Sequence, residues 1–502
     1  MPRSLASYDA LPYDSRPIAL TRPDTLAARA ALLGANPADP QTARVLELGC
    51  ASGGNLIPMA MRFPEARFFG VDLSKRQVAD GQQRITSLGL TNLTLEHADI
   101  LDWSPPAGTF DYIIGHGVFS WVPEPVRMRI LALCEQKLSP RGIAFISFNT
   151  LPGFHLRAIT RDMLRDADRP EHPAAERIQT ARAWLDDLDD ILTGREDLEA
   201  QLLCREIHEL RGARDSYLLH EYLAECNTPY SVRTFAQTAE TRGLAFLGEA
   251  DLSTLSLLDL DPDPEGFDAQ SLLAAESTAD QARLRPFRQS ILCRAEARKA
   301  PNPLAMADAL HWQAELQETE AGWMDPAGRE LTPDTPWLAE ALAQLAQAFP
   351  GSCDTRALLA QPEDAQTRRN RLGQLLGLAA AGILRPATTP QPPATPVVPR
   401  LTALAREELA DGQTFVSSLA THAPIELDRF SRALLTALDQ SADLDDLLRH
   451  LAEAVRTDPV MARETGLDSV DAESRDALVA ANAERLLAVF ARHAVLEPST
   501  TR

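Results

Sequence analysis

Long apolar segments are missing from this sequence, since no run approaches the roughly 20 residues that a membrane-spanning helix needs. The first residues, M-P-R-S-L-A-S-Y-D-A, also lack the apolar centre of a secretory signal peptide. Only six cysteines occur, at positions without the pair spacing of a zinc cluster or a disulfide framework. We therefore expect a cytoplasmic protein with reduced thiols, no metal site and no membrane insertion.

Positive charge is also scarce. Asp and Glu number 71 against 49 Lys and Arg, which leaves a net charge of -22 at pH 7. Because such a surface repels phosphate backbones, we expect no nucleic-acid partner, while basic or neutral substrates remain compatible. The length of 502 residues predicts about three domains with ordinary globular cores.

The stretch A-R-V-L-E-L-G-C-A-S-G-G-N at 43–55 combines an apolar run, a turn of small residues and the start of a helical segment. A strand, a glycine turn and a helix form the nucleotide-binding unit of open α/β sheets. Strands and helices alternate as far as residue 149, which predicts a Rossmann-like parallel sheet with helices on both faces. The expected strands are 44–48, 67–71, 93–97, 110–115 and 142–148, followed by 244–249 and 287–294 from later in the chain.

The rest of the chain is mainly helical. Residues 155–228 read as an insertion over the strand ends, with a separate helical domain followed by an unrelated α+β piece as the alternative. Arg368, Arg369 and Arg371 lie on the third helix of a winged-helix-like unit, where DNA binding competes with a solvated helix face; the acidic charge favours the latter. The expected units are the α/β core 1–154, the insertion 155–228, the end of the sheet 229–298, the winged-helix-like unit 299–386, a proline-rich linker 387–400 and a helical unit 401–502.

The glycine pattern distinguishes between two kinds of cofactor. Gly49 and Gly54 match the first and third glycines of the dinucleotide fingerprint, but Ala51 occupies the second position, where glycine admits the pyrophosphate. The pattern acid–x–G–x–(G/A)–x–G from Glu47 to Gly53 suits S-adenosylmethionine, which has no phosphate. Its ammonium needs acceptors, which the acidic strand end offers, and its carboxylate needs the backbone N–H groups of the turn.

Two further strands end in acids. Asp72, followed by Leu73, lies about 20 residues beyond the glycine turn, where an acid takes ribose hydroxyls; a helix N-cap is the alternative. Asp99 can accept from an adenine amino group while Ile100 packs on the base, and an ordinary loop acid is the alternative.

The segment G-H-G-V-F-S-W-V follows the fourth strand. Gly115 and its neighbour Gly117 allow a ligand to approach the backbone. Phe119 and Trp121 can contact a sulfonium or an ammonium through cation–π attraction, with plain packing as the alternative for Trp121. For His116 we rank cofactor contact first, then a structural role, then a role as base.

Asn149 ends the fifth strand in F-N-T-L-P-G. Its amide can orient a nucleophile, and a turn-forming asparagine is the equal alternative.

These segments together resemble a known family. V-L-E-L-G-C-A-S-G-G-N, G-V-D-L-S, D-Y-I-I-G-H-G-V-F-S-W-V-P and I-S-F-N-T-L-P-G are similar to segments of bacterial class I methyltransferases that carry a methyltransferase regulatory domain. That group includes the rickettsial protein lysine methyltransferases. The blocks at 8–17, 215–223 and 287–294 also look like this group.

The resemblance implies a cofactor and its site. It places S-adenosylmethionine on Glu47, Gly49, Gly53, Asp72, Asp99 and the turn 115–117, and closes an N-terminal arm that includes Tyr13 over it. It also implies a bacterial cytoplasmic protein, a winged-helix-like C-terminal part and homodimers through helical segments.

The resulting hypothesis is methyl transfer from S-adenosylmethionine to the lysine amine of a protein substrate. A lysine, with a pKa of about 10.4, must first lose a proton, which a cationic cofactor and an aromatic pocket both favour. A small-molecule methyltransferase and a non-catalytic regulator that binds the cofactor remain as alternatives, with an NAD-dependent oxidoreductase far behind. The expected pocket residues are His116, Phe119, Trp121, Asn149, Tyr217 and Tyr222.

Overall fold

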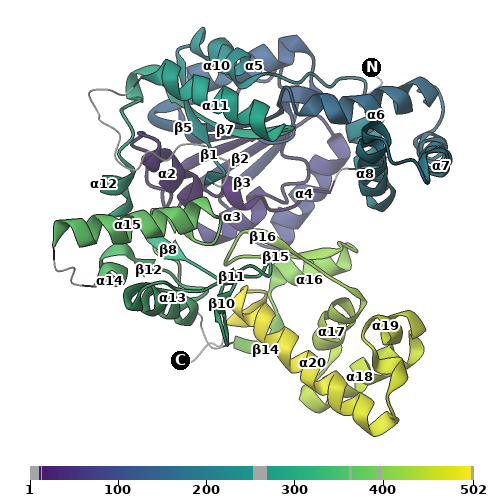
Figure 1. Ribbon diagram of the computed structural model, residues 1–502. Coiled ribbons are helices and arrows are strands. Elements are labelled where there is room, and N and C mark those ends of the chain that lie inside the picture. The colour runs from purple at the N-terminus through teal and green to yellow at the C-terminus, as the bar shows by residue number, and fades with distance from the viewer. Residues whose placement is uncertain (1–10, 13, 253–267, 361–363, 394–396, 499–502) are drawn as a thin grey trace.

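A seven-stranded sheet forms the centre of the computed structural model, which describes residues 11–12, 14–252, 268–360, 364–393 and 397–498 (Figure 1). The strand order is β3-β2-β1-β4-β5-β7-β6. The first five strands are parallel, and β7 is antiparallel to both β5 and β6. The strands are β1 (Arg44–Leu48), β2 (Arg67–Asp72), β3 (Leu93–His97), β4 (Phe110–Gly115), β5 (Leu138–Asn149), β6 (Leu244–Glu249) and β7 (Phe287–Arg294).

The Rossmann-like sheet expected from the sequence is thereby confirmed. All seven strands lie where the hydrophobic pattern places them, and the largest difference is the start of β5, at Leu138 instead of Gly142. Because β7 pairs with β5 over 143–149, the segment after the insertion completes the same sheet. The alternative of an unrelated α+β piece is therefore wrong.

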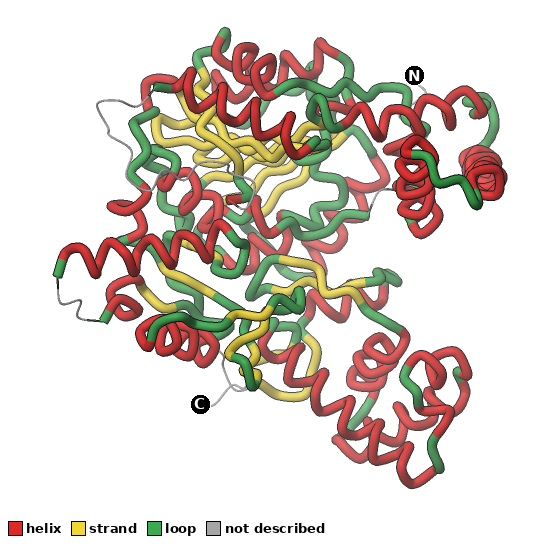
Figure 2. Tube along the Cα trace, in the orientation of Figure 1, coloured by secondary structure: helices red, strands yellow, loops and turns green. Residues whose placement is uncertain are grey.

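Helices cover both faces of the sheet, as the yellow strands between red helices in Figure 2 show. Successive residues of a strand point to opposite faces, so Val45 joins one apolar core and Leu46 the other. Three helices cover the first face, namely α2 (Pro23–Leu32), α3 (Leu56–Arg62) and α4 (Lys75–Ser87). The second is covered by α5 (Glu124–Lys137), α10 (Val232–Glu240) and α11 (Ala269–Arg283).

The segment after β5 is helical, as expected, and has its own apolar core around Leu185, Leu210 and Leu218. The chain leaves the sheet at Asn149 and returns at Tyr230, whose partner in a parallel bridge is Thr150. The helices therefore stand at the carboxyl edge of the sheet. They are α6 (Phe154–Ala167), α7 (Ala174–Leu192), α8 (Leu198–Gly212), α9 (Asp215–Tyr217) and the π-helical turn η3 (Leu218–Tyr222).

A middle unit packs below the sheet, around the fully buried Trp312 (Figure 1). Its helices are α12 (Pro303–Ala307), α13 (Pro336–Ala348), α14 (Thr355–Leu359) and α15 (Ala365–Ala380). Its two small sheets contain β8 (His311–Gln313), β12 (Cys353–Asp354) and β13 (Arg385–Ala387), and β9 (Gln317–Thr319), β10 (Gly322–Met324) and β11 (Glu330–Leu331). Ala28 and Leu32 of α2 belong to the same core, so α2 joins this unit to the sheet.

The C-terminal unit contains the expected helices, and Asp443 caps one of them by accepting from Asp446 N at 2.9 Å. It is not purely helical as expected, because two antiparallel strand pairs also form there. The strands are β14 (Val397–Leu401), β15 (Phe415–Ser418), β16 (Ala423–Glu426) and β17 (Leu496–Pro498). The helices are α16 (Ala403–Ala410), α17 (Arg429–Gln440), α18 (Leu444–Thr457), α19 (Pro459–Glu464) and α20 (Ala472–Arg492).

Asp24 lies in the first turn of α2 and does not cap it, because the helix begins at Pro23. Its fully buried carboxylate instead pairs with Arg22 at 2.6 Å and accepts from Gln391 Nε2 at 2.7 Å. The proline-rich segment is therefore docked on α2 through Gln391 and does not act there as a free spacer. No helix in the described part of the chain is long and apolar enough to cross a membrane.

Candidate functional site at the carboxyl edge of the sheet

The glycine turn (49–54) connects β1 to α3. Gly49 N donates to Val71 O at 2.8 Å, which ties the turn to the end of β2. Gly49 has φ +76°, and a Cβ there would lie 2.3 Å from Val118 Cγ2. Both the backbone conformation and the close approach of the loop after β4 therefore require glycine at this position.

Glu47 lies at the end of β1 with only 3 % of its surface exposed. Its Oε1 accepts from Asn55 Nδ2 at 2.8 Å, whereas Oε2 has no hydrogen-bond partner among the described residues. Burial raises the pKa of Glu47 to about 7, the nearby Asp72 charge adds to the shift, and the Asn55 hydrogen bond opposes it. A buried carboxylate oxygen without a partner is suited to a cationic or hydrogen-donating ligand group.

Asp72 connects the end of β2 to the glycine turn. Its Oδ2 accepts from Ala51 N and its Oδ1 from Ser74 N, both at 2.8 Å. Ser74 is the N-cap of α4 and accepts from Gln77 N, so the N-cap alternative for Asp72 is wrong. Burial raises the pKa of Asp72 despite these backbone hydrogen bonds. Each carboxylate oxygen keeps a lone pair with which to accept from a ligand hydroxyl.

Leu73, Asp99 and Ile100 follow the ends of β2 and β3. The Leu73 carbonyl lies 3.1 Å from His97 Nε2. Asp99 is exposed, and its Oδ1 accepts from Leu101 N at 2.9 Å. Ile100 is 8 % exposed and packs in the core beneath. An exposed carboxylate beside a buried apolar side chain suits a nucleobase. The carboxylate can accept a hydrogen bond from the edge of the nucleobase, and the apolar side chain can pack against its face.

His116 follows Gly115 at the end of β4 and is half-buried. Its ring stacks on Phe145 with centroids 6.1 Å apart, and the edge of Phe287 lies at the same distance. Burial lowers the pKa of His116 to about 4, so its imidazole is neutral at pH 7. A histidine with so low a pKa is a weak base near neutrality. This disfavours a role of His116 as a general base, the last of the three roles we ranked for it.

Trp121 is half-buried in the turn η2 (Phe119–Trp121), whereas Phe119 is only 1 % exposed. The Phe119 ring packs against Tyr230 and Phe235 with centroids 5.4 Å apart in each case. Phe119 therefore belongs to the core beneath the site and not to a pocket wall, contrary to our expectation.

Asn149 is buried at the end of β5, and its Nδ2 donates to Asn227 Oδ1 at 3.0 Å. That bond joins β5 to the end of the insertion, so the Asn149 amide already has a structural partner.

Tyr217 and Tyr222 pack inside the helical insertion. Tyr222 is 4 % exposed, and its hydroxyl donates to the Glu206 carboxylate. Burial raises its pKa well above the usual value, with the Glu206 charge adding to the shift. Tyr217 is half-buried with its ring 6.0 Å from that of Tyr222. The structure thus gives Tyr222 a packing role within the insertion instead of the pocket role we expected.

The N-terminal arm, residues 14–22, lies across the glycine turn. Ser15 Oγ accepts from Gly54 N at 2.8 Å, and Ile18 N donates to Asn55 Oδ1 at 3.0 Å. The expectation that Tyr13 closes over a ligand concerns a residue outside those that the structure describes. The sequence alone did not identify Ser15 and Asn55, because neither residue belongs to a motif from which its hydrogen-bond partner can be predicted.

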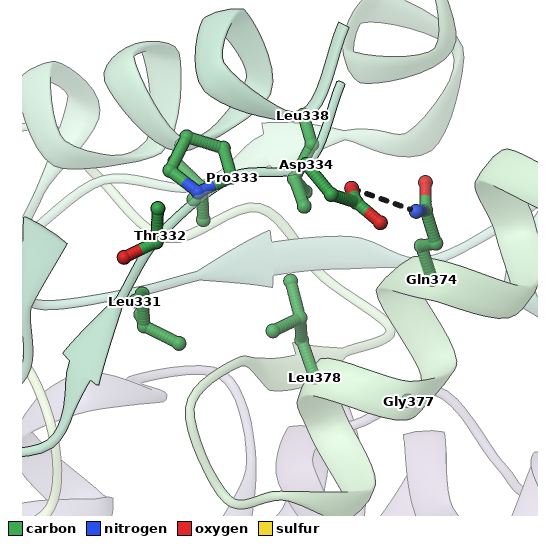
Figure 3. Close-up of a pocket in the computed structure, with 9 residues that line it drawn as sticks. Leu331, Thr332, Pro333, Asp334, Leu338, Gln374, Gly377 and Leu378 are labelled. Carbon is green, nitrogen blue, oxygen red and sulfur yellow. Dashed lines mark hydrogen bonds between the residues drawn. The ribbon is translucent and has the colours of Figure 1, made fainter. Parts of the chain in front are cut away.

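Two surface cavities occur elsewhere, in the middle unit. One of about 290 Å³ lies between Pro333, Asp334 and α15 (Figure 3). Another of about 900 Å³ is lined by Trp337 and Arg371 among others. Every lining residue belongs to the middle unit, so neither cavity includes the strand-end residues. Arg371 donates to Leu359 O at 2.5 Å and covers the Trp337 ring, which favours a structural role for this helix face.

Fold and site together are typical of the class of α/β proteins that bind nucleoside-type ligands at the carboxyl edge of the sheet. Three family models match the chain: a methyltransferase domain at 45–142, a predicted methyltransferase regulatory domain at 214–294 and the PKMT C-terminal winged helix domain at 398–495. The winged helix model falls after the proline-rich connector, whereas we expected such a unit before it, at 299–386.

Two uncharacterized proteins of Rickettsia prowazekii are similar in sequence. One is 38 % identical over 57 % of this chain, and this chain spans about half of that relative's length (52 %). The other is 36 % identical over 48 % of this chain and 96 % of its own length. The structure of PKMT2 from Rickettsia typhi has a TM-score of 0.79 at 24 % identity, covering 97 % of this chain and 99 % of PKMT2, which shows a shared fold.

A second structure of that protein, in complex with AdoHcy, has a TM-score of 0.77 at 23 % identity and covers 97 % of this chain and all of the other. The chain belongs to the family of S-adenosylmethionine-dependent class I methyltransferases that combine a methyltransferase domain, a regulatory domain and a PKMT-type winged helix domain.

Proposed function

We propose that this chain transfers a methyl group from S-adenosylmethionine to lysine side chains of a protein substrate. The observation that carries the proposal is the buried Glu47 carboxylate, with one oxygen unpartnered among the described residues, directly beside the glycine turn. A methyltransferase domain around that turn and the PKMT-type C-terminal domain support the reaction and the substrate class.

The cofactor supplies a methyl group activated on a sulfonium. Glu47 would accept from its ammonium, and Gly49 and Gly53, both at positive φ, would let the cofactor approach the backbone of the turn. Asp72, followed by Leu73, would accept from the ribose hydroxyls. Asp99 would accept from the adenine amino group while Ile100 packs on the base, and Gly115 and His116 would contact the cofactor from the end of β4.

The acceptor amine must be neutral to attack. Half-buried His116 and Trp121 present apolar ring surface at the strand ends, which favours the neutral form of a nearby lysine by desolvation. His116 is itself uncharged at pH 7 and does not repel the amine. The acidic chain, with net charge -22, favours approach of lysine-bearing partners.

Calorimetry with AdoHcy tests the cofactor site. Asp72→Ala should abolish binding, because it removes the ribose acceptor and frees the Ala51 and Ser74 N–H groups. Asp187→Ala, which alters an exposed acid on α7, is the matched control and should bind like the wild type. Unchanged affinity of Asp72→Ala would contradict the site.

A small-molecule acceptor is the second candidate. Trans-aconitate 2-methyltransferase of Variovorax paradoxus is 33 % identical over 107 residues, 21 % of this chain and 39 % of that enzyme. Incubating the protein with methyl-labelled cofactor and a bacterial lysate separates the two. Label on lysines of a protein band supports our proposal, and label confined to small molecules supports this alternative. AdoHcy binding without any label in either fraction indicates the non-catalytic regulator.

The proposal includes a homodimer in the bacterial cytoplasm. Ile191, Leu198 and Leu202 are exposed apolar side chains near the α7–α8 connection and offer a surface for pairing through helices. The six cysteines are free thiols, in keeping with a reducing compartment. Light scattering of the purified chain tests the pairing, and a monomer mass at micromolar concentration would contradict it.

A further inference from the structure

The turn between β15 and β16, residues 419–422, reaches the cofactor site from the C-terminal unit. His422 in this turn is only 2 % exposed, and its Nε2 lies 2.9 Å from Asn55 Oδ1. Asn55 in turn donates to Glu47. His422 lies 367 positions beyond Asn55 in sequence, yet only two hydrogen bonds separate it from the Glu47 carboxylate.

Every hydrogen-bonding position of the Asn55 amide is used. The two N–H bonds of Nδ2 point to Glu47 Oε1 at 2.8 Å and to Thr21 Oγ1 at 3.0 Å. Oδ1 accepts from Ile18 N at 3.0 Å and from His422 Nε2. A flipped amide would turn its oxygen toward the Glu47 carboxylate, and both donors to Oδ1 would then face an NH₂ group.

We propose that His422 is a positioning residue of the cofactor site: it fixes the Asn55 amide, which holds Glu47, so that the C-terminal unit completes the site built on the sheet. This inference rests on the proposed function, because it assumes that Glu47 binds the cofactor.

Further hydrogen-bond contacts hold the turn 419–422 in place beside Asn55. Arg22 donates to Ala420 O at 2.9 Å, and Ser418 Oγ lies 3.0 Å from His493 Nδ1. Burial and the facing Arg22 charge lower the pKa of His422 to about 3, and Asp24 opposes the shift. The imidazole is therefore neutral with a single N–H, which Asn55 Oδ1 can accept.

Two variants separate the side chain from its backbone. His422 has φ +54°, a conformation that glycine adopts readily, so His422→Gly removes the imidazole without added backbone strain. We expect the variant to bind AdoHcy about threefold to tenfold more weakly in calorimetry, the range of one lost hydrogen bond. His422→Gln restores an N–H donor and should recover most of the affinity, and His450→Gly on α18 is the control.

The same measurement in an Asn55→Ala background tests the route. If His422 acts through Asn55, adding His422→Gly to Asn55→Ala should change the affinity by less than about twofold. An equal loss in both backgrounds, or wild-type affinity of His422→Gly alone, would overturn the inference while leaving the proposed function intact. Wild-type protein that does not bind AdoHcy would overturn both.

Coupling is reciprocal, so bound AdoHcy should also stabilise the turn. The His422 amide donates to Ser418 O at 2.9 Å, and its hydrogen exchange in the full wild-type chain should slow when AdoHcy is added. This readout needs no variant to fold. Unchanged exchange at saturating AdoHcy would contradict the role of His422.

Discussion

The carboxyl group of Glu47 is buried, and burial disfavours its charged form. Its folded pKa of about 7 exceeds the ordinary value of 4.5, so the folded chain keeps a proton that the unfolded chain releases between these pH values. Raising the pH through this window therefore favours the unfolded state, and the full cost is present above pH 7. The side chain is almost fully buried, so little solvent screening reduces this cost.

Glu47→Gln removes the titration and keeps an oxygen for Asn55. We expect the free energy of unfolding to rise by about 2 to 3 kcal/mol at pH 8 and to be unchanged at pH 4. Urea denaturation at the two pH values measures this difference. A variant no more stable at pH 8 than the wild type would contradict the buried charge.

The same substitution should weaken cofactor binding, because a neutral amide attracts an ammonium less than a carboxylate does. We expect a loss of about tenfold or more in AdoHcy affinity at pH 8, measured by calorimetry. Stability and affinity should thus move in opposite directions at one residue, which is common for binding sites.

The position of the N-terminal arm, residues 14–22, depends on the absence of a side chain at Gly54. A Cβ on Gly54 would lie 2.2 Å from Ser15 O, so Gly54→Ala must displace the arm from the glycine turn. We expect faster proteolysis within residues 14–22 and AdoHcy affinity lowered about threefold or more. Limited proteolysis and calorimetry measure these effects.

Gly377→Ala is the matched control for the arm. Gly377 lies in α15, and a Cβ there meets nothing within 4 Å. It should raise stability by about 0.5 to 1 kcal/mol and leave cleavage of the arm unchanged. Identical cleavage of Gly54→Ala and wild type would show that the arm tolerates the added atom.

Strand β7 contributes Arg288 to a buried cluster of charged side chains. Arg288 is fully buried and pairs with Glu249 at 2.7 Å, Glu276 at 2.7 Å and Asp280 at 2.8 Å. These acids come from β6 and α11, so the cluster fastens α11 to the end of the sheet. Burial lowers the pKa of Arg288, but the surrounding acids outweigh it and raise the net value.

Arg288→Met removes the cation that these three buried acids share, so Glu249 loses its ion pair while Arg285 still pairs with Glu276 and Asp280. We expect a loss of about 3 to 5 kcal/mol in the free energy of unfolding, measured by urea denaturation at pH 7. Arg195→Met, which breaks the exposed pair with Asp197, should leave the midpoint unchanged. A variant as stable as the control would show that the cluster contributes nothing net.

At the scale of the whole molecule, α2 joins three units. Asp24 binds Arg22 and Gln391 beside the sheet, Ala28 and Leu32 pack in the middle unit, and Arg22 contacts the β15–β16 turn. Burial raises the pKa of Asp24, but Arg22, Gln391 and Arg62 together lower it below 3.8. Its stabilising effect is therefore present above pH 3.8 and is lost as pH falls through the lowered value.

Asp24→Asn should destabilise the chain by about 3 to 5 kcal/mol at pH 7, because it leaves Arg22 buried without its charge partner. Thermal denaturation measures the loss, and hydrogen exchange should rise in the β15–β16 turn. Asp39→Asn, at an exposed site, is the control and should match the wild type. Unchanged exchange in that turn would contradict the bracing role of α2.

The sequence by itself determined the positions of the seven strands, the α/β class of the fold and the part of the site formed by the strand ends and the glycine turn. Alternating apolar residues and strand–helix repetition encode the sheet, and Glu47, Gly49 and Asp72 stand at strand ends where parallel topology must gather them. The short strands of the C-terminal unit escaped prediction, because segments of four residues such as Phe415–Ser418 carry too little periodicity.

Only the tertiary structure decided which side chains complete the site. It placed Phe119 in the core and Tyr222 inside the insertion, because both rings find apolar neighbours there. It also brought Asn55 together with His422 across 367 positions. Local backbone geometry is encoded within a few residues, whereas such contacts depend on how separately folded surfaces pack, which no short motif records.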